Sequence, residues 1–205
     1  MLRTVSRRSF LMVAPAATLA ACTTDLAPVT YADPLADLHT RLGATAPLDA
    51  PAKAGPTVAL VYGSNIERLL QHKEDADKIL KQFGPLTNTS AMSDIDPQPL
   101  ITGGIAVLRV KYPGIKPLDD LAAARAQHFS TTIVLDFRQV LGKTVGHRTT
   151  ASLYAVFLDA RQVPISRIEV TGEGIMGAVG WTYKFREASD KAVLMFKEKV
   201  DQYWS

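Results

Sequence analysis

The first 21 residues constrain this chain most strongly, because they predict which part of it folds. They combine a basic start, an apolar run from Phe10 to Ala21 and small residues before Cys22, the three parts of an export signal that is removed from the mature protein. The apolar run is about 12 residues long, whereas a bilayer-spanning helix needs roughly 20. Cys22 is the only cysteine, so no disulfide can form within the chain and the fold must rely on its core.

The stretch Ser6–Leu11 reads Ser-Arg-Arg-Ser-Phe-Leu and resembles the twin-arginine signal of bacteria, with Met12 where that pattern most often has lysine. The resemblance implies that Arg7, Arg8, Phe10 and Leu11 direct export of an already folded protein.

Leu19–Cys22 reads Leu-Ala-Ala-Cys and resembles the lipobox of bacterial lipoproteins. The resemblance implies cleavage between Ala21 and Cys22, a diacylglycerol thioether on the Cys22 thiol, and acylation of the new amine. Two or more acyl chains hold a protein firmly on a membrane, whereas one binds reversibly. Thr23 stands where an aspartate would favour inner-membrane retention in enterobacterial lipoproteins. We therefore expect a periplasm-facing outer-membrane location, with the inner membrane as the weaker alternative.

The basic character of the full chain belongs to its signal. The chain has 23 Lys and Arg against 20 Asp and Glu, and three of its arginines, with no acid, lie in residues 1–21. The mature chain therefore has 20 basic and 20 acidic side chains. This balance removes the composition-based case for nucleic-acid binding.

The remaining chain divides into residues 22–56, predicted to be a lipidated tether, and residues 57–205, predicted to be one α/β domain. Prolines at 28, 34, 47, 51 and 56 disfavour helix and sheet in the tether. Fully extended, its 34 residues from Thr23 span on the order of 110 Å.

Apolar patterning predicts a mixed, largely antiparallel sheet packed by helices in two or three layers, with an amphipathic C-terminal helix. Residues 86–102 are the least readable part and are interpreted as a loop with one possible edge strand. The predicted strands are 57–62, 104–112, 131–141, 149–158 and 163–170, and the predicted helices are 64–83, 117–128 and 185–204. Ser64 and Glu67 have the spacing of a capping box for the first helix.

Several motifs that would carry chemistry have simpler interpretations. Gly172–Gly177 matches G-x-G-x-x-G, but the chain ends before a second strand with its acid could follow, so a turn or bulge is favoured. The four histidines, His39, His72, His128 and His147, show no metal-ligand spacing. Ser64 lacks the glycine that a nucleophile elbow requires. We therefore predict no cofactor, no metal site and no catalytic residue.

One polar set has two interpretations. Asp136 and Arg138 share one side of a predicted strand, and we expect them to pair with neighbours from the adjacent turns and strands: Arg148, Asp159 and Arg161. Cross-strand ion pairs on a solvated face explain such a pattern. The alternative is a recognition patch for a protein partner.

The phrases Ile133–Arg138 and Ser152–Arg161, with the closing helix, are similar to periplasmic α/β lipoproteins: the penicillin-binding-protein activators, the curli-secretion lipoprotein and the N-terminal domain of the Tol β-propeller protein. The resemblance covers roughly residues 57–204 and implies the fold more than the function. We expect a non-enzymatic accessory module, anchored in the membrane by lipid, that binds an envelope protein complex. The alternatives are a small periplasmic enzyme exported in folded form, and a ligand or lipid carrier.

Overall fold

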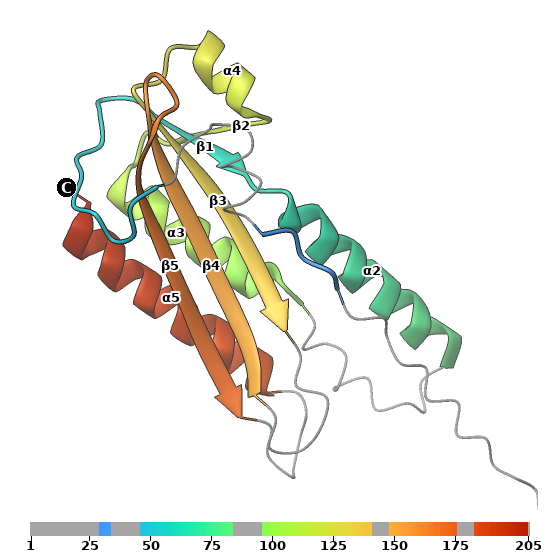
Figure 1. Cartoon of the computed structure of the whole chain (residues 1–205). Coiled ribbons are helices and arrows are strands. Elements are labelled where there is room, and N and C mark those ends of the chain that lie inside the picture. The colour runs from blue at the N-terminus through green and yellow to red at the C-terminus, as the bar shows by residue number, and fades with distance from the viewer. Residues whose placement is uncertain (1–28, 34–45, 84–95, 141–147, 176–182, 205) are drawn as a thin grey trace, which may run out of the picture.

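The computed structural model describes residues 29–33, 46–83, 96–140, 148–175 and 183–204 (Figure 1). Five strands form one sheet in the order β2-β1-β3-β4-β5. Pairings β2–β1 and β1–β3 are parallel, while β3–β4 and β4–β5 are antiparallel. The elements in chain order are β1 (Val58–Tyr62), α2 (Asn65–Phe83), α3 (Gln98–Lys111), β2 (Lys116–Leu118), α4 (Leu121–Ala126), β3 (Thr131–Val140), β4 (Arg148–Asp159), β5 (Pro164–Ile175) and α5 (Tyr183–Tyr203).

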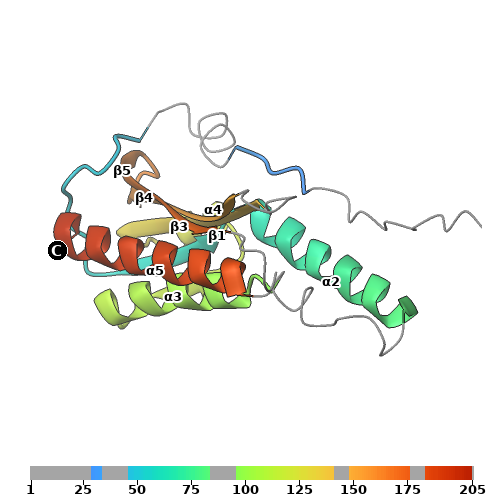
Figure 2. The ribbon, with the colours of Figure 1, turned by 90° about the horizontal axis from the view of Figure 1, so that it is seen from below.

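Helices α3 and α5 cover one face of the sheet side by side (Figure 2). The main core lies between them and the sheet, where alternate strand residues such as Leu135, Phe137 and Leu153 are fully buried. A smaller apolar cluster lies on the opposite face: Ala46, Val61, Val134, Val156 and Leu158. The predicted fold class is confirmed: a mixed, largely antiparallel sheet packed by helices, with a C-terminal amphipathic helix.

The predicted strand at 104–112 is wrong, because these residues belong to helix α3. Its buried residues are Leu100, Ile101, Gly104 and Leu108, a helical spacing, and Val110 is 80% exposed. Pro99 is compatible with the helix because it lies in the first turn, where a missing N–H breaks no helical bond. A Cβ on Gly103 would lie 2.7 Å from Val193 Cγ2 of α5, so glycine permits the close crossing of the two helices.

The predicted helix at 117–128 is also corrected. Lys116–Leu118 pairs with β1 as the short edge strand β2, and the helix begins only at Leu121. Asp120 caps it, with Oδ1 accepting from the backbone N–H of Ala123 at 2.7 Å. An acidic residue before the apolar positions therefore marks the helix start more accurately than Pro117 does.

Gly172 does not form the turn predicted for the glycine-rich motif. Strand β5 runs to Ile175, and Gly172 pairs with Ala151 of β4. A Cβ on Gly172 would lie 1.9 Å from the carbonyl oxygen of Ala188, so α5 packs directly on the strand backbone there. Gly177 lies outside the described residues.

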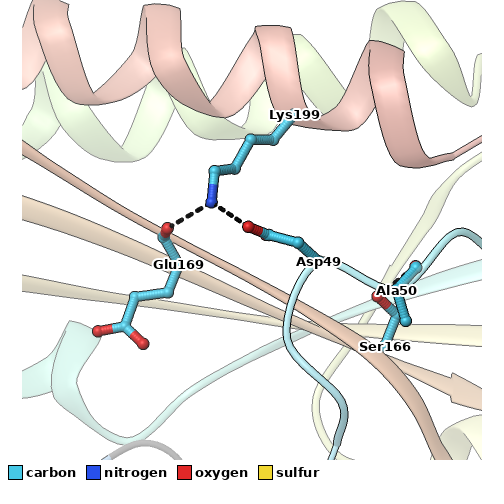
Figure 3. Close-up of polar contacts among 5 residues, drawn as sticks. All are labelled: Asp49, Ala50, Ser166, Glu169 and Lys199. Atoms are coloured by element: carbon cyan, nitrogen blue, oxygen red, sulfur yellow. Dashed lines mark hydrogen bonds and ion pairs between the residues drawn. The ribbon is translucent and has the colours of Figure 1, made fainter.

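Residues 46–56, predicted as part of the tether, pack on the body. Pro47 and Asp49 exchange backbone hydrogen bonds with Arg167 and so cover part of the exposed edge of β5. Figure 3 shows Lys199 of α5 reaching the carboxylate of Asp49, and Ser166 donating to the carbonyl of Ala50 at 2.8 Å. The chain therefore meets the folded body ten or more residues before β1 begins.

Candidate functional site

A polar site with several buried hydrogen bonds lies where β1 ends. Gly63 follows β1, and its N–H donates to the carbonyl of Leu135 at 2.8 Å. A Cβ there would lie 2.3 Å from Cγ of Asp136, so only glycine lets the backbone pass the carboxyl group. Asp136 lies on the side of β3 away from α3 and α5, since its neighbours Leu135 and Phe137 face the main core.

Asp136 is 2% exposed, and its carboxylate lies at the amino-terminal end of α2. Oδ1 accepts from the backbone N–H of Asn65 at 3.2 Å and from that of Phe137 at 2.9 Å. Oδ2 accepts from the side-chain amide of Asn65 at 3.0 Å. A carboxylate is favoured here because the first amides of a helix lack partners and carry partial positive charge.

These contacts correct the predicted capping box. Ser64 Oγ is buried and has no hydrogen-bond partner within the described ranges. The backbone N–H of Asn65, at the start of α2, donates instead to Asp136 of strand β3. Asn65 and Asp136 are 71 residues apart, so no local spacing indicates their contact.

The same asparagine holds the N-terminal segment of the chain. Asn65 Oδ1 accepts from the N–H of Ala32 at 2.8 Å, and Nδ2 donates to its carbonyl at 2.9 Å. One turn along α2, Arg68 Nη1 donates to the carbonyl of Thr30 at 2.8 Å. We call residues 29–33 the docked segment; Figure 1 shows it in blue beside the first turns of α2.

Tyr31, in the docked segment, packs against the main core cluster. The guanidinium carbon of Arg138 lies 5.6 Å from the centroid of its ring, within cation–π range. Burial raises the pKa of Tyr31 to about 12, although the backbone of Gln139 and the charge of Arg138 act to lower it. We call Asn65, Arg68, Asp136 and Arg138 together the N-terminal dock.

The five residues of the predicted patch are placed in separate regions. Asp136 and Arg138 belong to the N-terminal dock, where Asp136 bonds to Asn65. Arg148 pairs across to Glu173 of β5, with 2.7 Å between Nη1 and Oε2. Asp159 stabilises the β4–β5 turn, because Oδ1 accepts from the N–H groups of Arg161 and Val163. Arg138 is opposite Ser152, seven residues and roughly 23 Å along β4 from Asp159.

The histidines are also separate. His128 follows the end of α4 and has a positive φ of 54°. His72 is half-buried on α2, where burial lowers its pKa against the opposing charge of Asp75. His39 and His147 lie outside the described residues. In the described part of the chain, no three His, Cys, Asp or Glu side chains gather as a metal-ligand set.

An open pocket of about 320 Å³ lies at the carboxyl end of α5. It is lined by Pro51 and Ala52 from the N-terminal region and by Asp201–Trp204 of the helix end. Trp204 is 1% exposed and stacks on Phe157, with ring centroids 3.7 Å apart.

The export and lipidation residues, Arg7, Arg8, Phe10, Leu11, Ala21 and Cys22, lie outside the described residues. Among the helices that the structure describes, none is both long and apolar enough to cross a membrane.

No protein-family model and no curated protein matches this chain. Solved structures that are similar include two PelC dodecamers from Paraburkholderia phytofirmans, one of them a variant with a single substitution. The variant is 18% identical, with a TM-score of 0.36, and the match covers 76% of this chain and 95% of that one. The other is 18% identical, with a TM-score of 0.34 and coverages of 74% and 89%.

Proposed function

We propose that the protein is a lipid-anchored periplasmic module that binds an envelope protein complex and performs no catalysis itself. The observation that carries this proposal is the occupant of the N-terminal dock. Open α/β sheets commonly bind their ligands beyond the carboxyl ends of parallel strands. Here, at the end of β1 beside β3, Asn65 bonds to Asp136 and holds Ala32 of the same chain. The usual ligand position is therefore occupied by the protein's own N-terminal segment.

The other polar residues of the predicted patch differ in what their contacts do. Asp159 holds a turn, and Arg148 and Glu173 pair across β4 and β5 while remaining 66% and 47% exposed in their side chains. An exposed ion pair contributes little to stability. We therefore propose the Arg148–Glu173 end of the sheet as the surface that meets the envelope partner.

Lipid attachment at Cys22 and export through Arg7 and Arg8 complete the proposal, with the outer membrane as the destination. A fractionation experiment in a Gram-negative host tests both. The full chain should label with palmitate and sediment with the outer membrane. Cys22→Ser should abolish labelling, and Arg7→Lys with Arg8→Lys should block export. A palmitate-labelled, membrane-bound Cys22→Ser protein would contradict the anchor.

The binding role needs its own experiment. Photo-crosslinking residues placed at Arg148 and at Arg161 probe opposite ends of β4. The proposal predicts an envelope-protein adduct from Arg148 and a weaker one from Arg161. Equal adducts, or none, would contradict the proposed surface.

The alternative function is that of a ligand carrier, and the pocket beside Trp204 is the observation in its favour. Native mass spectrometry of the purified mature protein tests this alternative. The carrier is favoured if the protein holds a stoichiometric small molecule or lipid and if a variant with a filled pocket, for example Ala52→Trp, no longer holds it.

A further inference from the structure

The three central residues of the docked segment are each held by a different side chain of the body. Arg68 holds the carbonyl of Thr30, Arg138 lies over the ring of Tyr31, and Asn65 pairs with both backbone groups of Ala32. Asn65 is fully buried, so its side-chain amide depends on these partners. A buried amide without partners costs about 1–3 kcal/mol. The contacts therefore select one position for the segment.

This position limits the distance between the body and the lipid anchor. Val29 lies seven positions after Cys22, and this stretch spans at most about 25 Å when fully extended. If the chain were held only from Ala46 onward, 24 residues would span about 80 Å. Docking of residues 29–33 thus shortens the maximum reach by about threefold.

We propose that the N-terminal dock is a membrane-positioning site, which fixes the exit of the tether and holds the side of the body formed by α2 and β3 against the lipid surface. This inference rests on the lipid anchor proposed above. Asn65 holds Ala32, which lies ten positions after Cys22. The start of α2 therefore stays within about 36 Å of the acylated cysteine. An envelope partner is then reached only when it lies close to the same membrane.

A pair of insertions tests the proposal in the mature, lipidated protein reconstituted in phospholipid vesicles. One variant has a ten-proline spacer between Thr24 and Asp25, before the docked segment. The other has the same spacer between His39 and Thr40, after the docked segment and before Ala46. Such a spacer is semi-rigid and adds about 31 Å. Glu74→Cys on α2 supplies the only free thiol for a fluorescent dye, because Cys22 carries lipid, and the energy acceptor is a headgroup-labelled lipid.

The proposal predicts that the first spacer lowers energy transfer by roughly half. The second spacer should leave energy transfer unchanged, because it lengthens the chain after the docked segment and so does not change the distance from the lipid to the body. Adding Asn65→Ala and Tyr31→Ala should make the second spacer lower transfer as well. If both spacers lower transfer in the otherwise unchanged chain, the body hangs from residue 46 and the proposal is wrong. If neither lowers transfer, the tether does not set the distance, which also overturns it.

Flotation of the vesicles separates this result from failure of the anchor. The protein with an intact Cys22 should float with the vesicles in every insertion variant. If no variant floats, the lipid anchor is absent and both proposals fall. If all float and both spacers act equally, the anchor stands and only the positioning role is lost.

Discussion

The side-chain amide of Asn65 forms two hydrogen bonds with the backbone of Ala32, at 2.8 Å to its N–H and 2.9 Å from Nδ2 to its carbonyl. This pairing resembles the exchange of bonds between two strands, although one partner is a side chain at the start of α2. It joins the predicted tether to the body 33 residues before the helix. The N-terminal region therefore contributes to the fold as well as to the proposed anchoring.

Asn65→Ala should lower the free energy of unfolding by about 2–3 kcal/mol. The change removes both bonds to Ala32 and leaves Oδ2 of the buried Asp136 without the side-chain amide of residue 65. Urea denaturation followed by circular dichroism measures the loss. Gln71→Ala is the matched control on the same helix, because Gln71 is exposed and its bond among the described residues is to Asp75, four positions away. Its effect should stay within about 0.5 kcal/mol, and equal losses in the two variants would argue against the dock.

Gly172→Ala should destabilise the protein by about 3 kcal/mol or more. The added Cβ meets the carbonyl of Ala188 at 1.9 Å and the N–H nitrogen of Ala192 at 2.6 Å, so α5 has to move away from β5. Thermal unfolding provides the measurement. Gly114→Ala adds the same methyl group in open space and should change stability by about 0.5 kcal/mol or less. A Gly172→Ala protein as stable as the control would contradict the close packing of α5.

The Lys199–Asp49 pair should contribute more than the neighbouring pairs on α5. Its two side chains are 27% and 22% exposed, whereas those of Lys197 and Asp201 are 58% and 52% exposed. Water screens the exposed pair more strongly, so we expect about 1 kcal/mol for the first and less than about 0.5 kcal/mol for the second. Double-mutant cycles with Lys199→Met and Asp49→Asn, and with Lys197→Met and Asp201→Asn, measure both couplings. Equal couplings would contradict the docking of residues 46–56.

Two tyrosines should resist ionisation at high pH. Burial raises the pKa of Tyr31 and of Tyr112 from 10.0 to about 12. Between these values the unfolded chain loses protons that the folded chain keeps, so stability is intact below pH 10 and falls as pH rises toward 12. Tyrosinate absorbance should show Tyr31 and Tyr112 titrating late. Tyr31→Phe should reduce the late absorbance change, and an unchanged late absorbance in that variant would place Tyr31 in solvent.

The sequence predicted those parts of the fold whose patterns are local. Strand β1, the meander from β3 to β5, and helices α2 and α5 follow from apolar runs, turns and helical spacing. Helix α3 was not predicted, because Ile105, Val107 and Val110 are β-branched and favour a strand. Its helical spacing, Leu100, Gly104 and Leu108, begins in the range that was interpreted as a loop.

The N-terminal dock was predicted only in part. Asp136 and Arg138 were identified as a polar pair on one strand, but their partners Asn65 and Tyr31 come from segments about 70 and 107 residues earlier. The sequence does contain one signal: Gly63 and Asn65 follow a buried strand where a helix begins. The amino terminus of a helix favours a nearby carboxylate. The identity of that carboxylate follows only from the parallel register of Tyr62 with Leu135.

Hydrogen exchange at the backbone amide of Ala32 tests the central claim, that the docked segment is part of the folded body. In the mature protein this N–H donates to the buried Asn65 Oδ1, so we predict slow exchange at Ala32 that becomes fast in Asn65→Ala while the amides of β4 stay protected. Exchange at Ala32 as fast as in an unfolded peptide, in the unmodified protein, would contradict the account.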